Sequence, residues 1–212
     1  MDWIIATKIF AALFAIMNPL SCIPIVLAMT AGQSQAQQRN VILQMIITIA
    51  VGAALCALAG QKILSIFGID VTHFQFAGGL IVLMIALDML RGENSPTHAG
   101  SEQEQQAPKA GETIGIYPLG IPLTFGPGTI AAIIIIGQSA QGVSGEIGFY
   151  AGLIAYVICF SILLAASPFL SRGLSPSALS ISKRIMGMIL AAIAVEMMAD
   201  ATGTLFPALL RH

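Results

Sequence analysis

The chain has 212 residues, of which 57% are hydrophobic and only 9% are charged, whereas roughly 25% of a soluble domain is charged. Together with a mean hydropathy of +0.89, this excludes an ordinary soluble protein and indicates a multi-pass membrane protein with little mass outside the lipid bilayer. A formal net charge of −1 gives no electrostatic footprint for nucleic acid. The three cysteines, Cys22, Cys56 and Cys159, lie in apolar segments, and their odd number argues against a disulfide framework or a metal cluster.

Six apolar segments long enough to cross a bilayer follow one another along the chain. They cover residues 9–30, 41–59, 74–90, 114–136, 147–167 and 185–206. The only long polar stretch, residues 93–112, is rich in Glu, Gln, Ser and Pro and has too few apolar side chains to fold by itself. The chain therefore divides into a first half, residues 1–92, this polar linker, and a second half, residues 113–212.

The first apolar segment is interrupted at residues 18–24, which read Asn-Pro-Leu-Ser-Cys-Ile-Pro. Each proline removes a backbone donor and crowds the carbonyl four residues earlier, so Pro19 and Pro24 are expected to unwind or bend the helix near mid-membrane. Irregular backbone at that depth is tolerated only where it is buried in protein or lines a wet cavity. The interruption is therefore a candidate binding site, and a kink that serves packing alone is the alternative.

A second copy of this pattern occurs in the other half. Residues 122–127, Pro-Leu-Thr-Phe-Gly-Pro, match residues 19–24 at an offset of 103, and residues 187–197 match residues 79–89 at an offset of 108. The sequence thus predicts two halves of similar plan. Because three spans per half make the second half enter the membrane from the opposite side, we expect an all-α membrane protein of six transmembrane helices. These would form a 3+3 inverted-topology repeat with discontinuous helices 1 and 4.

The two interruptions supply groups that could hold a small polar ligand. Free N–H groups at a half-helix N-terminus attract an anion and unwound carbonyls attract a cation, so a zwitterion suits both. Glycine lets a ligand approach the backbone. For any single Ser or Thr, the alternative is a bond to its own helix carbonyl. The candidate substrate-binding residues are Asn18, Pro19, Ser21, Pro24, Thr124, Gly126, Pro127, Gly128 and Thr129.

Two carboxylates lie within predicted spans, where a charge is costly. Asp88 is three residues before Arg91, so an interfacial ion pair explains it as well as a functional role does. Glu196 lies twelve residues beyond Arg184, roughly 18 Å into its helix, and has no basic partner in that helix. We interpret Glu196 and Asp88 as candidates for proton coupling or gating. No cofactor is expected, and the coupling ion would be H+ or Na+.

The distribution of positive charge predicts the orientation in the membrane. Loops 1, 3 and 5 should be cytoplasmic and both termini extracytoplasmic, because positive charge favours the cytoplasmic side. The six basic residues assigned to these loops are Arg39, Arg91, Lys109, Arg172, Lys183 and Arg184.

Enzymatic motifs are missing from the sequence. It contains no His-Glu-x-x-His, no Ser-His or Ser-Lys pair at membrane depth and no phosphate-binding loop, so an enzyme is not expected. The spacing of Gly148 and Gly152 allows two helix backbones to approach closely, which we assign to packing within the chain in preference to dimerisation. A homo-oligomer is possible, but the sequence does not indicate one.

Several motifs together resemble one family, the MarC family of six-span prokaryotic inner-membrane proteins, also classed as neutral amino acid transporters. The motifs are Asn-Pro-Leu-Ser-Cys-Ile-Pro-Ile from residue 18, Phe-Gly-Ile-Asp from 67, Phe-Ala-Gly-Gly from 76, Pro-Leu-Gly-Ile-Pro-Leu-Thr-Phe-Gly-Pro-Gly from 118 and Arg-Ile-Met-Gly-Met-Ile-Leu from 184. The resemblance covers nearly the whole chain. It implies uptake or export of small neutral amino acids such as glycine, alanine or serine, and a multi-pass location in the bacterial inner membrane. Typical members have Asn-Pro-x-Gly where this chain has Ser21, a departure that could alter substrate size or affinity.

The leading hypothesis is a secondary transporter that binds a small zwitterion between the two interruptions and works by alternating access. One alternative is an exporter or channel-like facilitator of another small metabolite. A second is a non-transporting membrane factor that acts through a partner, for example by way of the acidic linker.

Overall fold

The computed structural model describes residues 1–92, 113–170 and 175–206, and these residues form helices and turns without a β-strand. The predicted all-helical class is therefore confirmed. The predicted linker, residues 93–112, lies outside the described residues. The helices are α1 (Trp3–Met17), α2 (Pro19–Met29), α3 (Gln35–Ile66), α4 (Val71–Arg91), the π-helix η1 (Leu119–Thr124), α6 (Pro127–Ser139), α7 (Gly142–Ala165), α8 (Ser167–Leu170) and α9 (Pro176–Leu205).

Five helices in the described residues are long and apolar enough to cross a membrane, with α1 and α2 counted together as one interrupted span. The predicted span at residues 114–136 has a different form. It is divided into η1 and α6, and α6 has only 13 residues. The predicted discontinuity of helices 1 and 4 is thus present, whereas the 3+3 arrangement of six spanning helices remains a prediction.

Two helices extend well beyond their apolar runs because capping residues set their ends. α3 begins at Gln35, where Ser34 and Gln37 form a reciprocal capping box, which satisfies two otherwise unpaired N–H groups. α9 begins at Pro176, and the Ser175 side chain accepts a hydrogen bond from the Ala178 N–H. Residues 168–184, between the fifth and sixth apolar segments, are predicted from the sequence as a loop; this prediction is wrong, since most of them form α8 and the first turns of α9.

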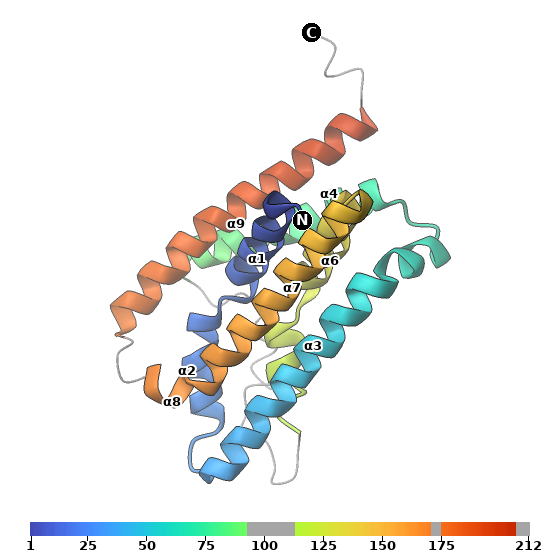
Figure 1. Cartoon of the computed structure of the whole chain (residues 1–212). Helices are drawn as coiled ribbons and strands as arrows, with labels where there is room; N and C mark the ends of the chain where they lie inside the picture. Colours follow the sequence, from blue (N-terminus) through green and yellow to red (C-terminus); the bar gives the residue numbers. More distant parts are fainter. Residues whose placement is uncertain (93–112, 171–174, 207–212) are drawn as a thin grey trace.

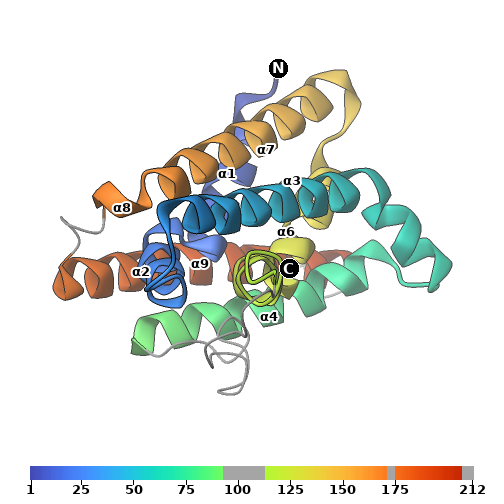
Figure 2. The same cartoon turned by 90° about the horizontal axis from the view of Figure 1, so that it is seen from below.

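The short helix α6 occupies the middle of the bundle. It contacts α1, α3, α4 and α7, and Figure 2 shows it between α3 and α4. Residues 131–136 of α6 are all buried, so this helix is apolar on every side. It positions the second interruption at the centre of the molecule.

Helices α4 and α9 lie side by side along their length (Figures 1 and 2) and pack through two glycines. Gly79 of α4 lies against the Ala194 carbonyl and Met197 of α9, and Gly187 of α9 lies against the Ala86 carbonyl of α4. The contacts are reciprocal: each glycine meets the alanine that lies seven residues beyond the other glycine. This is the geometry of a two-fold axis passing between two antiparallel helices.

The Gly148–Gly152 face of α7 packs against α1. A side chain at Gly148 would meet the Asp2 carbonyl, and one at Gly152 would meet the Ala6 carbonyl. The expectation that these glycines serve close packing within the chain is confirmed.

Candidate functional site

The first interruption is a hinge of one residue. Asn18 has φ 35° and ψ 74° and lies between α1 and α2. Its N–H donates to the Phe14 carbonyl at 3.1 Å and closes α1, while its side-chain oxygen accepts from the Ser21 N–H at 3.4 Å and caps α2. Asn tolerates this left-handed backbone better than most residues, and Pro19 follows at the first helical position, where its missing N–H has no intrahelical role.

Pro24 does not interrupt the helix, contrary to the prediction. It lies within α2, which loses one intrahelical hydrogen bond there but continues for five more residues. Pro24 is exposed and Ser21 is half-buried, whereas Asn18 and Pro19 are buried. The break is therefore confined to Asn18 and Pro19.

The second interruption is much longer. N–H groups between Leu119 and Phe125 donate to the carbonyl five positions earlier, for example Ile121 to Ile116 at 2.8 Å and Phe125 to Gly120 at 2.8 Å. This π-type pattern uses N–H groups on either side of Pro122, which has none to donate. Gly126 is then extended, with φ −98° and ψ −177°, before Pro127 starts α6.

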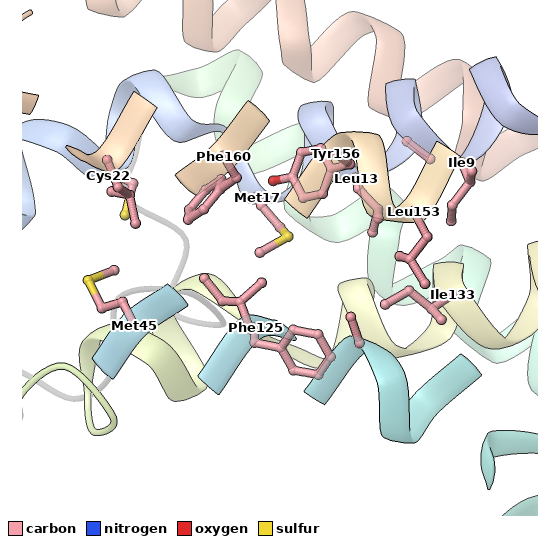
Figure 3. Packing of buried hydrophobic residues seen from close by; sticks show 14 of the residues in the cluster. Ile9, Leu13, Met17, Cys22, Met45, Phe125, Ile133, Leu153, Tyr156 and Phe160 are labelled. Carbon is pink, nitrogen blue, oxygen red and sulfur yellow. The ribbon is translucent and has the colours of Figure 1, made fainter. Parts of the chain in front are cut away.

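The structure brings the first turn of α2, which follows the first interruption, into contact with the end of η1 in the second. The Cys22 sulfur lies 3.6 Å from the Thr124 hydroxyl oxygen, between groups 102 positions apart in the sequence. Cys22 belongs to a buried apolar cluster that also contains Met17, Met45 and Phe125, and all four of these residues are labelled in Figure 3. Sequence reasoning named Thr124 but treated Cys22 only as an apolar side chain.

Two polar groups at the interruptions are buried without a partner. The Asn18 amide nitrogen and the Thr129 hydroxyl make no hydrogen bond, although Asn18 is only 6% exposed and Thr129 is 0% exposed. Leaving such a group unpaired costs about 1–3 kcal/mol. Thr124 differs, because its hydroxyl donates to the Leu119 carbonyl at 2.7 Å. Each interruption thus contributes one buried donor that no protein group in the described residues satisfies.

The start of α6 offers backbone donors beside these side chains. No side chain caps this end of the helix, and the first N–H groups of a helix have no intrahelical acceptor. Gly126, Gly128 and Thr129 are buried there, while Pro127 is exposed. A side chain at Gly128 would come within 2.9 Å of Ile85 in α4, so this glycine permits close packing of α6 on α4.

The positions at which α2 and α6 begin give a different alignment of the two halves from the one predicted by the proline pairs. Pro19 and Pro127 both occupy the first position of a helix, which corresponds to an offset of 108, the same offset that relates Gly79 to Gly187. On this register Ser21 corresponds to Thr129. The offset of 103 between the proline pairs is out of step, because Pro122 lies inside η1 and has no counterpart at a helix start.

The two carboxylates lie apart from the interruptions. Glu196 forms an ion pair with Lys8 of α1, with 2.9 Å between Nζ and Oε1, and the two side chains are 54% and 35% exposed. Sequence reasoning looked for a partner only within the helix of Glu196 and missed Lys8. Asp88 is half-buried in the last turns of α4.

Metal chemistry finds no support in the described residues, where no three His, Cys, Asp or Glu side chains come together as a metal site requires. All three cysteines are free thiols, as the sequence predicted. The donors at the interruptions are an amide, hydroxyls, a thiol and backbone groups, so they can bind a neutral or zwitterionic molecule by hydrogen bonds.

Comparison with known proteins gives a consistent result. The chain is 32% identical over 209 residues to the UPF0056 membrane protein YhcE of Escherichia coli, covering 99% of this chain and 97% of the relative. It is 28% identical to the UPF0056 membrane protein YvbG of Bacillus subtilis, covering 95% of each chain. It is also 32% identical to the UPF0056 membrane protein MJ1677 of Methanocaldococcus jannaschii, covering 90% of this chain and 92% of the relative.

No solved structure matches the chain. The family model described as MarC family integral membrane protein matches residues 3–206. The protein is thus a multi-pass integral membrane protein that belongs to the MarC family.

Proposed function

We propose that this protein is a secondary transporter of small neutral amino acids such as glycine, alanine or serine. The observation that carries the proposal is the pairing of two helix interruptions around buried, unpartnered polar groups, Asn18 Nδ2 and Thr129 Oγ1. In hydrocarbon, broken helices are tolerated where they are buried in protein or line a polar cavity, and transporters use such breaks to bind substrate. The absence of a charged side chain among Asn18, Cys22, Thr124 and Thr129 favours a substrate without net charge.

The chemistry of the site suits a zwitterion. Its carboxylate would accept from the Asn18 amide, the Thr129 hydroxyl and the first N–H groups of α6, where the helix dipole also favours a negative charge. Its ammonium would donate to carbonyls that the interruptions leave without α-helical partners. The Met17, Met45 and Phe125 side chains nearby would exclude water and strengthen these interactions.

The helix contacts support the 3+3 inverted repeat that alternating access would use. If the two halves are exchanged in the register that relates Pro19 to Pro127, α1 corresponds to η1 and α2 corresponds to α6. The contact of α1 with α7 then becomes that of η1 with α3, and the contact of α4 with α6 becomes that of α9 with α2. All four contacts are present. Such symmetry lets the halves exchange two conformations that open on opposite sides.

The present conformation is closed around the site, since Asn18, Thr124 and Thr129 are all buried. Substrate would therefore enter only when the helices move apart. Asn18 is a suitable pivot, because a single residue joins α1 to α2.

Proton coupling at Glu196 forms part of the proposal. Protonation of Glu196 would neutralise one member of its ion pair with Lys8, which joins α1 to α9. If Glu196→Gln left proton-driven uptake unchanged, this part would be abandoned. The expected extracytoplasmic termini and plasma-membrane location follow from the charge bias and the bacterial relatives; Lys109 and Arg172, which contribute to that bias, lie outside the described residues.

The first test is thermal unfolding of the purified full-length protein in detergent with glycine, L-alanine or L-serine at millimolar concentration. A ligand that binds only the folded state raises its apparent stability. We expect a shift in the wild type that Thr129→Val abolishes. Thr202→Val is the matched control, because that hydroxyl donates to its own helix at Met198, 2.7 Å away.

Flux in proteoliposomes then distinguishes the mechanisms. A carrier saturates and shows counterflow, whereas a channel-like facilitator does neither. If no amino acid shifts a well-folded sample, the substrate is another metabolite or the protein acts through a partner. In the partner case, deletion of residues 92–110 would abolish function while the interruptions tolerate substitution.

A further inference from the structure

Tyr156 of α7 carries another buried polar group without a partner, one of six such groups among the described residues; the others outside the interruptions belong to Gln33, Gln44 and Ser167. Its side chain is 1% exposed, and its hydroxyl makes no hydrogen bond. The ring is held firmly, with Phe10 edge-on at a centroid distance of 5.9 Å and Phe160 tilted at 5.9 Å. In Figure 3 the hydroxyl points away from Ile9 and toward Met17 and Phe160. The packing therefore fixes a hydroxyl that bonds to nothing in the protein.

This hydroxyl faces the same buried region as the two interruptions. Met17, the neighbour of Asn18, belongs to one apolar cluster with Cys22, Tyr156 and Ile133. Thr129 lies one helical turn before Ile133 on α6 and so shares its face. Tyr156 of α7 thus shares one apolar cluster with residues beside both interruptions, Met17 and Cys22 on one side and Phe125 and Ile133 on the other.

The corresponding position in the first half behaves differently. The offset of 108 relates Tyr156 to Thr48 of α3, whose hydroxyl donates to the Gln44 carbonyl at 2.8 Å. The Thr48 hydroxyl has a hydrogen-bond partner in its own helix, whereas the Tyr156 hydroxyl has none. An unbonded buried hydroxyl contributes nothing to the stability of the empty protein and costs free energy, so its presence points to a ligand.

We propose that Tyr156 is a substrate-binding residue that recognises the carboxylate. This inference rests on the proposed function and adds a third arm to its site. An ionised carboxylate only accepts hydrogen bonds and offers about four lone-pair positions, so the Asn18 amide, the Thr129 hydroxyl and the Tyr156 hydroxyl can all donate to it. The arrangement selects a ligand with a carboxylate over an amine or amide of the same size.

The test compares Tyr156→Phe with Tyr150→Phe in the full-length protein. Tyr150 lies on the same helix and is 38% exposed, which makes it a matched control. Thermal unfolding is followed while glycine, L-alanine or L-serine is titrated. We expect Tyr156→Phe to unfold, without ligand, at the wild-type temperature or above, and to need at least about tenfold more ligand for half of the shift, since a hydrogen bond to a charged group is lost. Tyr150→Phe should match the wild type in both measurements.

Three outcomes would overturn the inference. If Tyr156→Phe reaches half of its thermal shift at the same ligand concentration as the wild type, Tyr156 lies outside the site, and the proposed function stands. If the variant without ligand unfolds at a lower temperature than the wild type, but still needs the same ligand concentration for half of the shift, the hydroxyl is structural. If the well-folded wild type shows no shift with any of the three amino acids, the proposed function and this inference fail together.

Discussion

The two helix interruptions differ in length and in how they satisfy the backbone. At the first, one left-handed residue, Asn18, ends α1 and begins α2, and both helices remain α-helical up to that residue, apart from the one hydrogen bond that Pro24 cannot make within α2. At the second, residues 119–126 leave the α-helical pattern altogether, with π-type bonds followed by an extended Gly126. The first is therefore a hinge between two regular half-helices, and the second is an unwound segment.

The difference shows that the position of a proline decides its effect. Pro19 and Pro127 lie at helix starts, where no donor is needed, and Pro24 sits inside α2 at the cost of one hydrogen bond. Only Pro122, within η1, coincides with a change of bonding pattern. The unwound segment can supply carbonyls to a ligand along its length, whereas the hinge supplies one amide and a pivot.

The largest effect is expected at the hinge. Asn18→Ala removes the cap of α2, worth about 1 kcal/mol, and places alanine, which lacks the local hydrogen bonds that help asparagine adopt the left-handed region, in that conformation at a cost of about 1–2 kcal/mol. The free energy of unfolding should fall by about 2–3 kcal/mol, as measured by denaturant unfolding in detergent.

Asn18→Gly is the control that separates the effect of Asn18 on backbone stability from its effect on ligand binding. Glycine accepts the left-handed conformation and caps almost as well, so stability should be nearly restored. Binding of amino acids should remain weak in both variants, because both lack the amide nitrogen. Equal destabilisation by Ala and Gly would contradict the account of Asn18 as a left-handed hinge.

The same substitution at two positions tests the second interruption. Thr124→Val removes the buried hydrogen bond from the Thr124 hydroxyl to the Leu119 carbonyl, which should destabilise the protein by about 1 kcal/mol. Thr129→Val removes a hydroxyl that bonds to nothing and should leave the empty protein as stable as the wild type, while weakening ligand binding. A loss of stability in Thr129→Val without loss of binding would argue against its role in the site.

Much of the fold was predictable because its signals are local. Proline and glycine act through their own backbone. The positions of both interruptions, and the correspondence of Gly79 in the first half with Gly187 in the second, could therefore be found from the sequence. The helix ends were missed where polar caps extend a helix beyond its apolar run, as at Ser34 and Ser175. The error of five positions in the proline register arose because matching letters does not reveal which proline starts a helix.

The site was predictable only in its chain-local parts. The repeat indicated that residues near Asn18 and Thr124 would meet, and the contact between Cys22 and Thr124 joins those segments. The parts contributed by other helices could not be found in this way. Tyr156 and the partner of Glu196 depend on how distant helices pack, and Lys8 and Glu196 are 188 positions apart.

A smaller effect on stability is expected at the ion pair between Lys8 of α1 and Glu196 of α9 than at the Asn18 hinge between α1 and α2. Glu196→Gln and Lys8→Met each break an ion pair between partly exposed side chains, and such pairs contribute about 0.2–1 kcal/mol. Denaturant unfolding of both single variants and of the double variant gives the coupling energy. If the double variant lost the full sum of the two single losses, the pair would not interact, and the proposed link between α1 and α9 would be wrong.

The smallest effect distinguishes a neutral cap from a charged one. Asp70, outside the spanning helices, caps α4 by accepting from the Thr72 N–H at 2.7 Å, and this hydrogen bond lowers the pKa of its carboxyl below the usual value. A lowered folded-state pKa means that the cap contributes above the unfolded-state pKa and is lost as pH falls through the folded-state pKa. Asn18 has no such titration, so acid should loosen the first turn of α4 while the hinge stays intact.

Hydrogen exchange of the Thr72 and Ser21 amides at neutral and acidic pH, corrected for intrinsic rates, measures the starts of α4 and α2. Asp70→Asn should remove the pH dependence at Thr72. Equal loosening of both helix starts in acid would show that the carboxylate is not what distinguishes them.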